Sequence, residues 1–465
     1  MLDLWEHQKR GLELAKKERD VAFFWDPGTG KTREVIEILR YLYNLEKKML
    51  RTYIFAPLVV LPNWKAEIKK YSKIPEKQIC VLGSGLTGTE KAHLLATSEA
   101  NIFAINYDAL INGNILVELM KKPPHILVCD EVHRVKNIQA KRTKAMIKLA
   151  DTARRRFILT GTPILNSQLD LFGQFRVLDR GETFGTNYFI FRGDYFYDKN
   201  AGMDRLKYFP DWRPRPDTST RLQEKISRKV SVAKKEDCLD LPPLIETEIL
   251  VEMTPEQRKA YTQMKEDFIT YVNNEACVAT LAITKALRLQ QIVSGYLMTE
   301  SGLFHEFKDT PREKALEEKL EDLRDAGKKV LTWAVFKPNY KILEKVFTRL
   351  GMKYTMLTGE TQDKEKQISR FRQDPEYQGM IAHPGAGGIG VNLVEAQYSI
   401  IYSRNFSLEQ AEQSKARNYR GGSEIHSKIT HFHLIADGTI DRVIFDALVK
   451  KKDLSNSILT LAKML

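Results

Sequence analysis

The feature that most constrains the fold of this 465-residue chain is a series of short apolar runs, each separated from the next by a longer amphipathic stretch. Runs in the first half hold too many consecutive apolar residues for a sheet with one wet face, so both faces are expected to be covered. Apolar runs that alternate with helix-length stretches predict a parallel sheet wrapped by helices. Strands are expected at residues 21–25, 52–57, 101–107, 125–131 and 155–161, and helices at about 31–45 and 61–71.

A second series of the same kind fills the second half of the chain. A chain of 465 residues is also too long for one ordinary core. The predicted fold class is therefore α/β, with two parallel-sheet lobes that carry helical insertions. In the second lobe a strand is expected at residues 246–253, two helices between about 255 and 293, and further strands at 329–336, 354–359, 379–384, 398–404 and 428–436.

The predicted boundary between the lobes lies after residue 235, near the Pro242–Pro243 pair. The first lobe, residues 1–235, contains an insertion at about 170–235 in which aromatic, glycine and basic residues crowd together. This insertion shows little strand alternation and is expected to be partly helix and partly loop. The second lobe, residues 236–465, contains a helical insertion at about 253–300.

Composition excludes some classes of protein and leaves others open. No run of about 18 apolar residues is present, so no membrane span is expected, and the opening MLDLWEHQKR lacks the pattern of a secretory signal. The formal net charge of +13 and the pI near 9.3 suggest a polyanionic partner, with a well-solvated surface as the alternative. The four cysteines stand singly, which argues against a zinc module or disulfide frame and indicates a reducing compartment.

The most specific local pattern is the segment DPGTGKT, which lies directly after an expected strand and before an expected helix. Its glycines let backbone N–H groups approach phosphate oxygens, and the following helix adds the positive end of its dipole. Lys31 would neutralise the outer phosphates and the Thr32 hydroxyl would bind Mg²⁺. Seven residues are therefore candidates for nucleotide binding: Asp26, Pro27, Gly28, Thr29, Gly30, Lys31 and Thr32.

The second pattern is ILVCDEVH, an apolar strand that ends in two carboxylates. Phosphoryl transfer needs a magnesium ion near the transferred phosphate and a group that orients the attacking water. Asp130 is the candidate for the metal and Glu131 for the water. A strand that merely ends in acidic residues is common, so the prediction depends on the phosphate-binding segment upstream.

Three weaker patterns complete the set. Thr160, Gly161 and Thr162 follow an expected strand, where their hydroxyls could bond to the acidic pair; a helix-capping turn is the alternative. The glycine-dense segment 383–393, which includes Gly390, could bring backbone close to phosphate or ribose, with a tight turn as the alternative. Arg417 and Arg420 stand three apart on one face of an expected helix, as a pair of arginine fingers or as part of a solvated basic helix.

The order of these patterns resembles that of superfamily-two helicases and, within them, the Swi/Snf-type DNA translocases, almost from end to end of the chain. The Lys136–Asn137 extension, the LPP segment and the helical insertions in both halves separate this type from RNA helicases. The segments that carry the resemblance are LWEHQKRGLELA (4–15), IFAPLVVLPNWKAEIKKY (54–71), AINYDAL (104–110), DEVHRVKN (130–137), LTGTPILN (159–166), LPPLIETEILVEMTPEQRKAY (241–261), ALRLQQI (286–292) and GETQDKEKQISRF (359–371).

The resemblance implies that both parallel-sheet lobes are RecA-like. It also implies an enzyme with ATP and Mg²⁺ as cofactors and double-stranded DNA, including forked or branched DNA, as partner. ATP would sit between the two lobes, with Gln8 at the adenine edge, and hydrolysis would drive translocation that displaces proteins, remodels DNA or migrates branches. A monomer is expected, in the cytoplasm of a bacterium or virus-infected cell, or in the nucleus of a eukaryote. The residues expected to contact DNA are Trp64, Lys65, Tyr107, Lys136, Asn137 and Thr358.

The sequence departs from the family pattern at several places. Trp25 precedes the phosphate-binding segment where a small residue is usual, and Ala416 and Ser423 replace an acidic residue and a glutamine near the arginine pair. Three alternatives stay open from the residues alone. They are an RNA helicase of the same superfamily, a strand-separating DNA helicase, and a non-catalytic scaffold that binds DNA and nucleotide.

Overall fold

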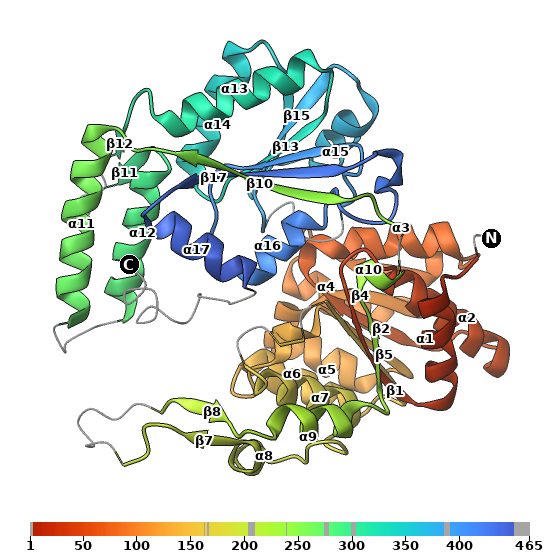
Figure 1. Ribbon diagram of the computed structural model, residues 1–465. Helices are drawn as coiled ribbons and strands as arrows, with labels where there is room; N and C mark the ends of the chain where they lie inside the picture. Colours follow the sequence, from red (N-terminus) through yellow and green to blue (C-terminus); the bar gives the residue numbers. More distant parts are fainter. Residues whose placement is uncertain are drawn as a thin grey trace. The chain divides into compact units, whose positions relative to one another are not determined.

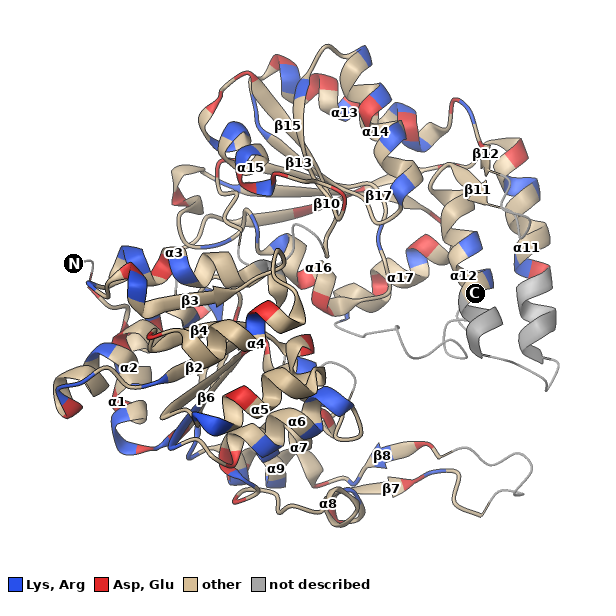
Figure 2. Cartoon of the chain, turned by 180° about the vertical axis from the view of Figure 1, so that it is seen from behind, with Lys and Arg blue, Asp and Glu red and all other residues tan. Residues whose placement is uncertain are grey.

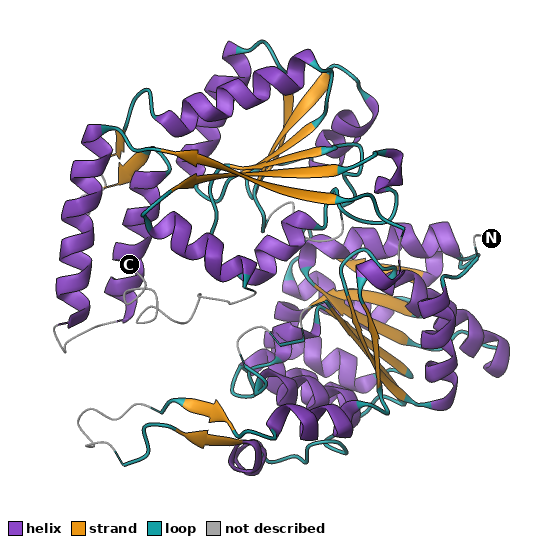
Figure 3. Ribbon diagram, in the orientation of Figure 1, coloured by secondary structure: helices purple, strands orange, loops and turns teal. Residues whose placement is uncertain are grey.

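The computed structural model describes residues 3–161, 163–164, 167–202, 210–238, 240–273, 279–298, 304–385 and 391–450. The chain divides into two compact units, Met1–Leu239 (unit 1) and Asp240–Leu465 (unit 2). Each unit is a parallel sheet with helices on both faces (Figures 1 and 3). The predicted α/β class with two parallel sheets is therefore confirmed. In the described part of the chain, no helix is long and apolar enough to cross a membrane.

Unit 1 is built on a seven-stranded sheet in the order β3-β4-β2-β5-β6-β1-β9, and every pair of neighbours is parallel. All residues of β1, β2 and β5 are buried, which explains why these runs are continuously apolar rather than alternating. The strands are β1 Asp20–Trp25, β2 Thr52–Ala56, β3 Ile79–Leu82, β4 Ile102–Asn106, β5 Ile126–Asp130, β6 Arg155–Thr160 and β9 Val230–Ala233.

The helices of unit 1 follow the strands in chain order. The predicted helices at 31–45 and 61–71 correspond to α2 and α3. The α-helices of this part are α1 Glu6–Lys17, α2 Lys31–Glu46, α3 Leu61–Tyr71, α4 Gly88–Thr97, α5 Gly113–Lys121, α6 Lys141–Ala150 and α7 Asp170–Asp179. The 3₁₀ turns are η1 Leu58–Val60, η2 Glu76–Gln78, η3 Tyr107–Ile111 and η4 Val132–Val135.

The aromatic-rich insertion differs from its prediction. It contains a short antiparallel ribbon that extends away from the sheet of unit 1 (Figure 1) and a strand, β9, that returns to the sheet beside β1. Its strands are three or four residues long, too short for a periodic pattern. Several of its aromatic side chains pack on one another, with Phe191 4.9 Å from Phe184 and 5.0 Å from Tyr195 between ring centroids. The elements are α8 Tyr188–Tyr195, β7 Phe196–Asp198, β8 Trp212–Pro214, α9 Thr218–Ile226 and α10 Lys235–Cys238.

Unit 2 has a six-stranded parallel sheet in the order β10-β17-β16-β13-β15-β14. The strands are β10 Leu244–Val251, β13 Val330–Trp333, β14 Lys353–Leu357, β15 Tyr377–Ala382, β16 Tyr398–Ile401 and β17 Ile429–Ala436, and β11 Tyr296–Met298 pairs with β12 Phe304–Glu306 in a separate ribbon. The helices are α11 Pro255–Asn273, α12 Ala279–Val293, α13 Pro311–Asp325, α14 Lys337–Arg349, α15 Lys364–Gln373, α16 Leu408–Lys415, η5 Ser423–Ile425 and α17 Ile440–Val449.

A buried ion cluster lies inside unit 2. The Asp441 carboxylate accepts hydrogen bonds from Arg312 and, at 2.8 Å, from Arg404. All three residues are nearly fully buried. Burial alone would raise the pKa of Asp441, but the two guanidinium groups outweigh it and hold that pKa below its ordinary value. The charge of Arg404, which follows β16, is thus balanced by a carboxylate of α17.

Candidate functional site

Strand order decides which sequence patterns meet in unit 1. The strands β1, β6 and β5 are neighbours and run parallel, so their carboxyl ends lie at one edge of the sheet. Segment 26–32 follows β1, Thr160 ends β6, and Asp130 ends β5. This edge is where ligands bind in open parallel sheets. Patterns that are far apart in the sequence therefore form one candidate site.

The glycine-rich segment forms the turn between β1 and α2. Gly28 and Gly30 have φ values of 91° and 85°, a region that side chains disfavour. Two hydrogen bonds fix the segment to its neighbours. The Asp26 carboxylate accepts one from the Lys235 backbone N–H at 3.0 Å, and the Thr29 carbonyl lies 2.8 Å from the His7 Nε2. Burial lowers the pKa of His7, which favours the neutral ring as the donor in this bond.

Lys31 is the first residue of α2, and Thr32 lies in the same first turn. The Lys31 ammonium donates to the Trp25 carbonyl at 2.7 Å and to the Asp26 carbonyl at 3.2 Å. These contacts fold the side chain back over the turn. Positive charge, a helix N-terminus and backbone N–H groups are thus gathered at one place, as phosphate binding requires.

Asp130 is the most closely constrained residue of the site. Its Oδ2 accepts a hydrogen bond from the Trp64 indole N–H at 2.9 Å, and its carbonyl accepts one from the Tyr107 hydroxyl at 2.8 Å. Burial, together with the charge of Glu131, raises the pKa of Asp130 to about 6, while Lys31 acts in the opposite direction. A carboxylate so held is pre-oriented for a cation.

Glu131 has a left-handed backbone, with φ 53°, which is unusual for a residue other than glycine. Its Oε2 lies 3.5 Å from the Thr160 hydroxyl and 3.4 Å from the His133 Nδ1, and that nitrogen lies 3.2 Å from the same hydroxyl. The predicted bond between the hydroxyl after β6 and the acidic pair is therefore present through Thr160. The neighbouring Thr162 lies outside the described residues.

Gly161 explains how β6 meets the phosphate-binding turn. A Cβ atom at this position would lie 2.7 Å from the Pro27 Cδ, closer than van der Waals contact allows. The turn therefore packs directly on the end of β6, next to Thr160. The sequence shows a small residue at this position, but it does not show that the residue contacts Pro27.

Three of the predicted DNA contacts have buried side chains. Trp64 is fully buried, Tyr107 is 2% exposed, and the Thr358 side chain is 3% exposed. The Thr358 hydroxyl accepts the Glu360 N–H at 3.3 Å inside a turn. Trp64 and Tyr107 donate hydrogen bonds to Asp130, whereas Thr358 bonds within its own turn. Contact of these three residues with DNA stays a prediction.

The other predicted DNA contacts lie at the surface of unit 1. Asn137 is exposed, and Lys65 and Lys136 are partly exposed. Lys65 pairs with Glu76 at 2.6 Å, and Lys136 pairs with Asp170 at 3.2 Å. Both lysines follow the carboxyl ends of neighbouring strands, β2 and β5.

The two arginines of unit 2 differ from their prediction. The helix α16 ends at Lys415, so Arg417 and Arg420 lie in the turn after it and share no helix face. Arg417 is 4% exposed and donates to the Val391 carbonyl at 3.2 Å, whereas Arg420 is partly exposed. Gly390, the remaining candidate of this unit, lies outside the described residues.

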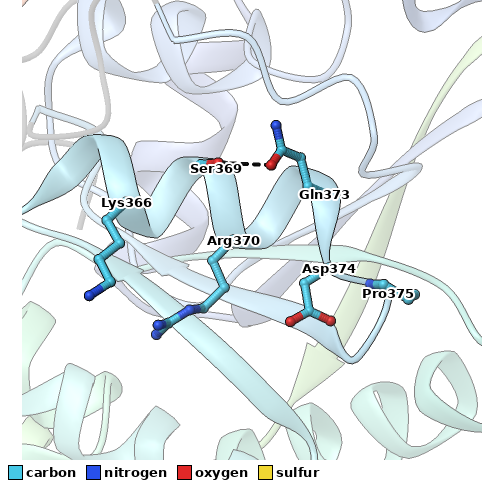
Figure 4. A pocket seen from close by; sticks show the side chains of 6 residues that line it. All are labelled: Lys366, Ser369, Arg370, Gln373, Asp374 and Pro375. Atoms are coloured by element: carbon cyan, nitrogen blue, oxygen red, sulfur yellow. Dashed lines mark hydrogen bonds between the residues drawn. The ribbon is translucent and has the colours of Figure 1, made fainter.

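A shallow hollow beside α15 is lined by charged and polar side chains and one proline (Figure 4). It lies at the turn that leads into the start of β15, whereas ligands of open parallel sheets bind at the carboxyl ends of strands. It is therefore not part of the candidate site. Its lining residues are Lys366, Ser369, Arg370, Gln373, Asp374 and Pro375.

Two site residues were absent from the sequence-based candidates. His7 holds the Thr29 carbonyl, and Trp5 lies beside Gly30, where a Cβ atom would be 3.3 Å from its ring. Their position next to Gln8 in the sequence was the only available signal. Gln8 itself is 3% exposed, and its amide donates to the Gly30 carbonyl at 3.3 Å.

A phosphate-binding turn, a carboxylate pair at the end of another strand of the same sheet, and a second parallel α/β unit define a class of protein, the helicase-like ATPases. Two family models match the chain: the SNF2-related domain over residues 7–296, more than half of the chain, and the helicase conserved C-terminal domain over residues 312–422. The chain belongs to the SNF2-related family.

Individual relatives are distant in sequence. Nuclear protein STH1/NPS1 of Saccharomyces cerevisiae is 24% identical over 99% of this chain, and the chain spans 35% of that relative's length. Protein p41 of Acyrthosiphon pisum secondary endosymbiont phage 1 is 25% identical over 94% of this chain and 93% of the relative. The Sulfolobus solfataricus SWI2/SNF2 ATPase core in complex with dsDNA is a similar solved structure, with 22% identity, a TM-score of 0.44 and coverage of 99% of this chain and 95% of that chain.

Proposed function

We propose that this chain hydrolyses ATP and uses the cycle to move along double-stranded DNA. The observation that carries the proposal is the position of β5 in the sheet of unit 1. On one side of it, β6 and β1 lead into the nucleotide segments; on the other, β2 and β4 lead into segments 61–71 and 107–111. Asp130 at the end of β5 is bonded from the second side by Trp64 and Tyr107.

The residues present fit a magnesium ion held together with ATP. Mg²⁺ in such enzymes takes one or two protein oxygens and completes its shell with phosphate oxygens and water. The described residues contain no group of three or more His, Cys, Asp or Glu that would hold a metal without the nucleotide. The Thr32 hydroxyl and the Asp130 carboxylate would be the protein ligands. When bound, the ion neutralises charge on the β- and γ-phosphates.

The remaining groups act on phosphate and water. Lys31 would exchange its two carbonyl partners for phosphate oxygens, since a charged acceptor forms the stronger bond. Glu131, oriented by Thr160 and His133, would accept a hydrogen bond from the attacking water. Arg420 would stabilise charge on the γ-phosphate, and Arg417 would hold the segment at Val391 in place.

Duplex DNA would be gripped mainly through its phosphates. Acidic and basic residues are interspersed along the helices of both units (Figure 2), so the net charge of +13 is not the source of binding by itself. Contacts would instead come from local groups at the carboxyl edge, Lys65, Lys136 and Asn137. Binding of this kind falls steeply with salt and depends little on base sequence.

The proposal is tested by the steady-state ATPase rate of the full chain with duplex, forked and four-way-junction DNA, single-stranded DNA and RNA. The expected result is the largest stimulation by duplex-containing DNA, together with ATP-dependent displacement of a triplex-forming strand from a duplex. Stimulation by RNA alone would assign the chain to the RNA helicases. Unwinding of a forked duplex without triplex displacement would show that the chain is a strand-separating helicase. An absence of ATPase activity would favour the non-catalytic scaffold.

The DNA contacts have their own test, with a matched control. Lys136→Ala and Lys65→Ala are each expected to lower the slope of log affinity against log salt by about 1. The control is Lys319→Ala, because Lys319 on α13 is also an ion-paired surface lysine, 2.8 Å from Asp322. Equal slopes in all three variants would contradict the assigned contacts.

A further inference from the structure

An exposed aromatic ring lies beside the phosphate-binding turn. Trp5 is 41% exposed, although it directly precedes α1 and lies next to Gly30. A Cβ atom at Gly30 would be 3.3 Å from the Trp5 ring and 2.5 Å from the Gln8 Nε2. The indole, the Gln8 carboxamide and the turn are therefore packed against one another, with much of the indole still open to solvent.

The neighbouring Gln8 has little capacity left for a ligand. Its Oε1 accepts the Trp5 backbone N–H at 3.0 Å, and its Nε2 donates to the Gly30 carbonyl at 3.3 Å. Only 3% of the residue is exposed. A base edge could therefore reach few of its atoms, and most of the surface available to a base at this end of the turn belongs to Trp5.

The ring of Trp5 is supported from within unit 1. His7 lies against it, with ring centroids 5.7 Å apart and planes 31° apart, and His7 in turn meets Trp25 edge-on at 4.7 Å. His7 is also bonded to the Thr29 carbonyl of the turn. His7 thus connects the Trp5 ring to the phosphate-binding turn. This connection lowers the entropy cost of binding a ligand that contacts both.

We propose that the Trp5 indole is the surface on which the base of the bound nucleotide stacks. The proposal rests on the function proposed above, because it assumes that segment 26–32 holds the phosphates. Every base has a π face, so stacking selects by ring area rather than by hydrogen-bond pattern. Trp5 therefore favours two-ring purines over one-ring pyrimidines and contributes nothing to the binding of phosphates alone.

The test uses ligands that are not turned over: ADP, UDP and inorganic pyrophosphate. Affinities of the full chain are measured by calorimetry for wild type, Trp5→Ala, Trp5→Leu and Trp5→Phe. Trp5→Ala and Trp5→Leu are expected to weaken ADP on the order of 10-fold, to weaken UDP less, and to leave pyrophosphate unchanged. Trp5→Phe keeps an aromatic face and should recover most of the loss. ADP should also quench the tryptophan fluorescence of wild type but not of Trp5→Phe.

Trp212→Phe serves as the fluorescence control, because this tryptophan lies on the β7–β8 ribbon and should leave the ADP-induced quenching intact. A parallel loss of pyrophosphate and ADP affinity in Trp5→Leu would overturn the proposal, since the ring would then support only the turn. An unchanged ADP-to-UDP ratio in Trp5→Ala would overturn it as well. Failure of the proposed function would give a different result from failure of the stacking proposal. Wild type would then bind neither ADP nor pyrophosphate, and Lys31→Ala would not change the affinity for either ligand.

Discussion

The bond between Trp64 and Asp130 gives the sharpest prediction about how the site works. Trp64→Phe removes the indole N–H that donates to the Asp130 Oδ2 at 2.9 Å and keeps a buried aromatic ring. A hydrogen bond to a charged group contributes about 1.5–3 kcal/mol. Since about 1.36 kcal/mol corresponds to a factor of ten in rate, the ceiling of the effect is roughly 10- to 150-fold. Loss of a group that orients a metal-binding carboxylate costs about 10- to 100-fold in metal affinity or activity, which agrees with this range.

The assay is the ATPase rate of the full chain as a function of Mg²⁺ concentration, with saturating ATP and duplex DNA. The expected result for Trp64→Phe is a rise of about 10-fold in half-saturating Mg²⁺, or an equivalent fall in kcat/KM for the magnesium nucleotide. The matched control is Trp333→Phe in unit 2. Trp333 is 1% exposed, and its indole donates to the Ser399 hydroxyl at 3.3 Å, so the control loses the same ring volume and a neutral bond.

Both variants should lose stability through the cavity that the smaller ring leaves. Only Trp64→Phe should change the magnesium dependence. The reasoning would be refuted by an unchanged half-saturating Mg²⁺ and kcat in Trp64→Phe, or by the same change in both variants. In the first case the bond would be structural only, and in the second the effect would come from general loosening.

The remaining predictions concern turnover and stability. Lys31→Ala and Glu131→Gln should each lower the ATPase rate by roughly 100-fold or more without changing thermal unfolding, and near-normal turnover in either would contradict its assigned role. Arg420→Ala should lower kcat far more than nucleotide affinity, measured by single-turnover kinetics and calorimetry; equal losses would argue against a role in the transition state. Asp441→Asn leaves two buried guanidinium groups of unit 2 without a carboxylate, which should cost about 3–5 kcal/mol in urea denaturation, whereas a loss under about 1 kcal/mol would mean that the cluster is hydrated. Because the pKa of Asp441 is held below its ordinary 3.8, its contribution is complete above that pH and should disappear as the pH falls below it.

The strands of both sheets were predictable because parallel strands buried on two faces must be apolar throughout. The run VAFFW became β1 and ILVCD became β5, each within one residue of the expected bounds. Short edge and ribbon strands were not predictable. The strands β7, β8 and β9 have only three or four residues each. No local sequence pattern specifies the strands with which they pair.

The functional residues follow the same division. Lys31, Thr32, Asp130 and Glu131 were proposed as site residues because phosphate and magnesium chemistry demands particular residue types next to a strand end. The resemblance placed Trp64 and Tyr107 at the DNA, whereas the structure shows both side chains as hydrogen-bond donors to Asp130. A resemblance of motifs does not show which group a side chain contacts, because that depends on how distant segments pack.

The sequence by itself therefore determined the α/β class and the presence of two parallel sheets, and it supplied the candidate residues for phosphate and metal. These depend on apolar periodicity and on local backbone requirements, which are properties of neighbouring residues. Only the tertiary structure decided that β5 stands between the nucleotide strands and the strands leading to segments 61–71 and 107–111, and that Trp64 and Tyr107 hold Asp130. Strand order and side-chain direction arise from packing between distant segments, and no local pattern encodes them.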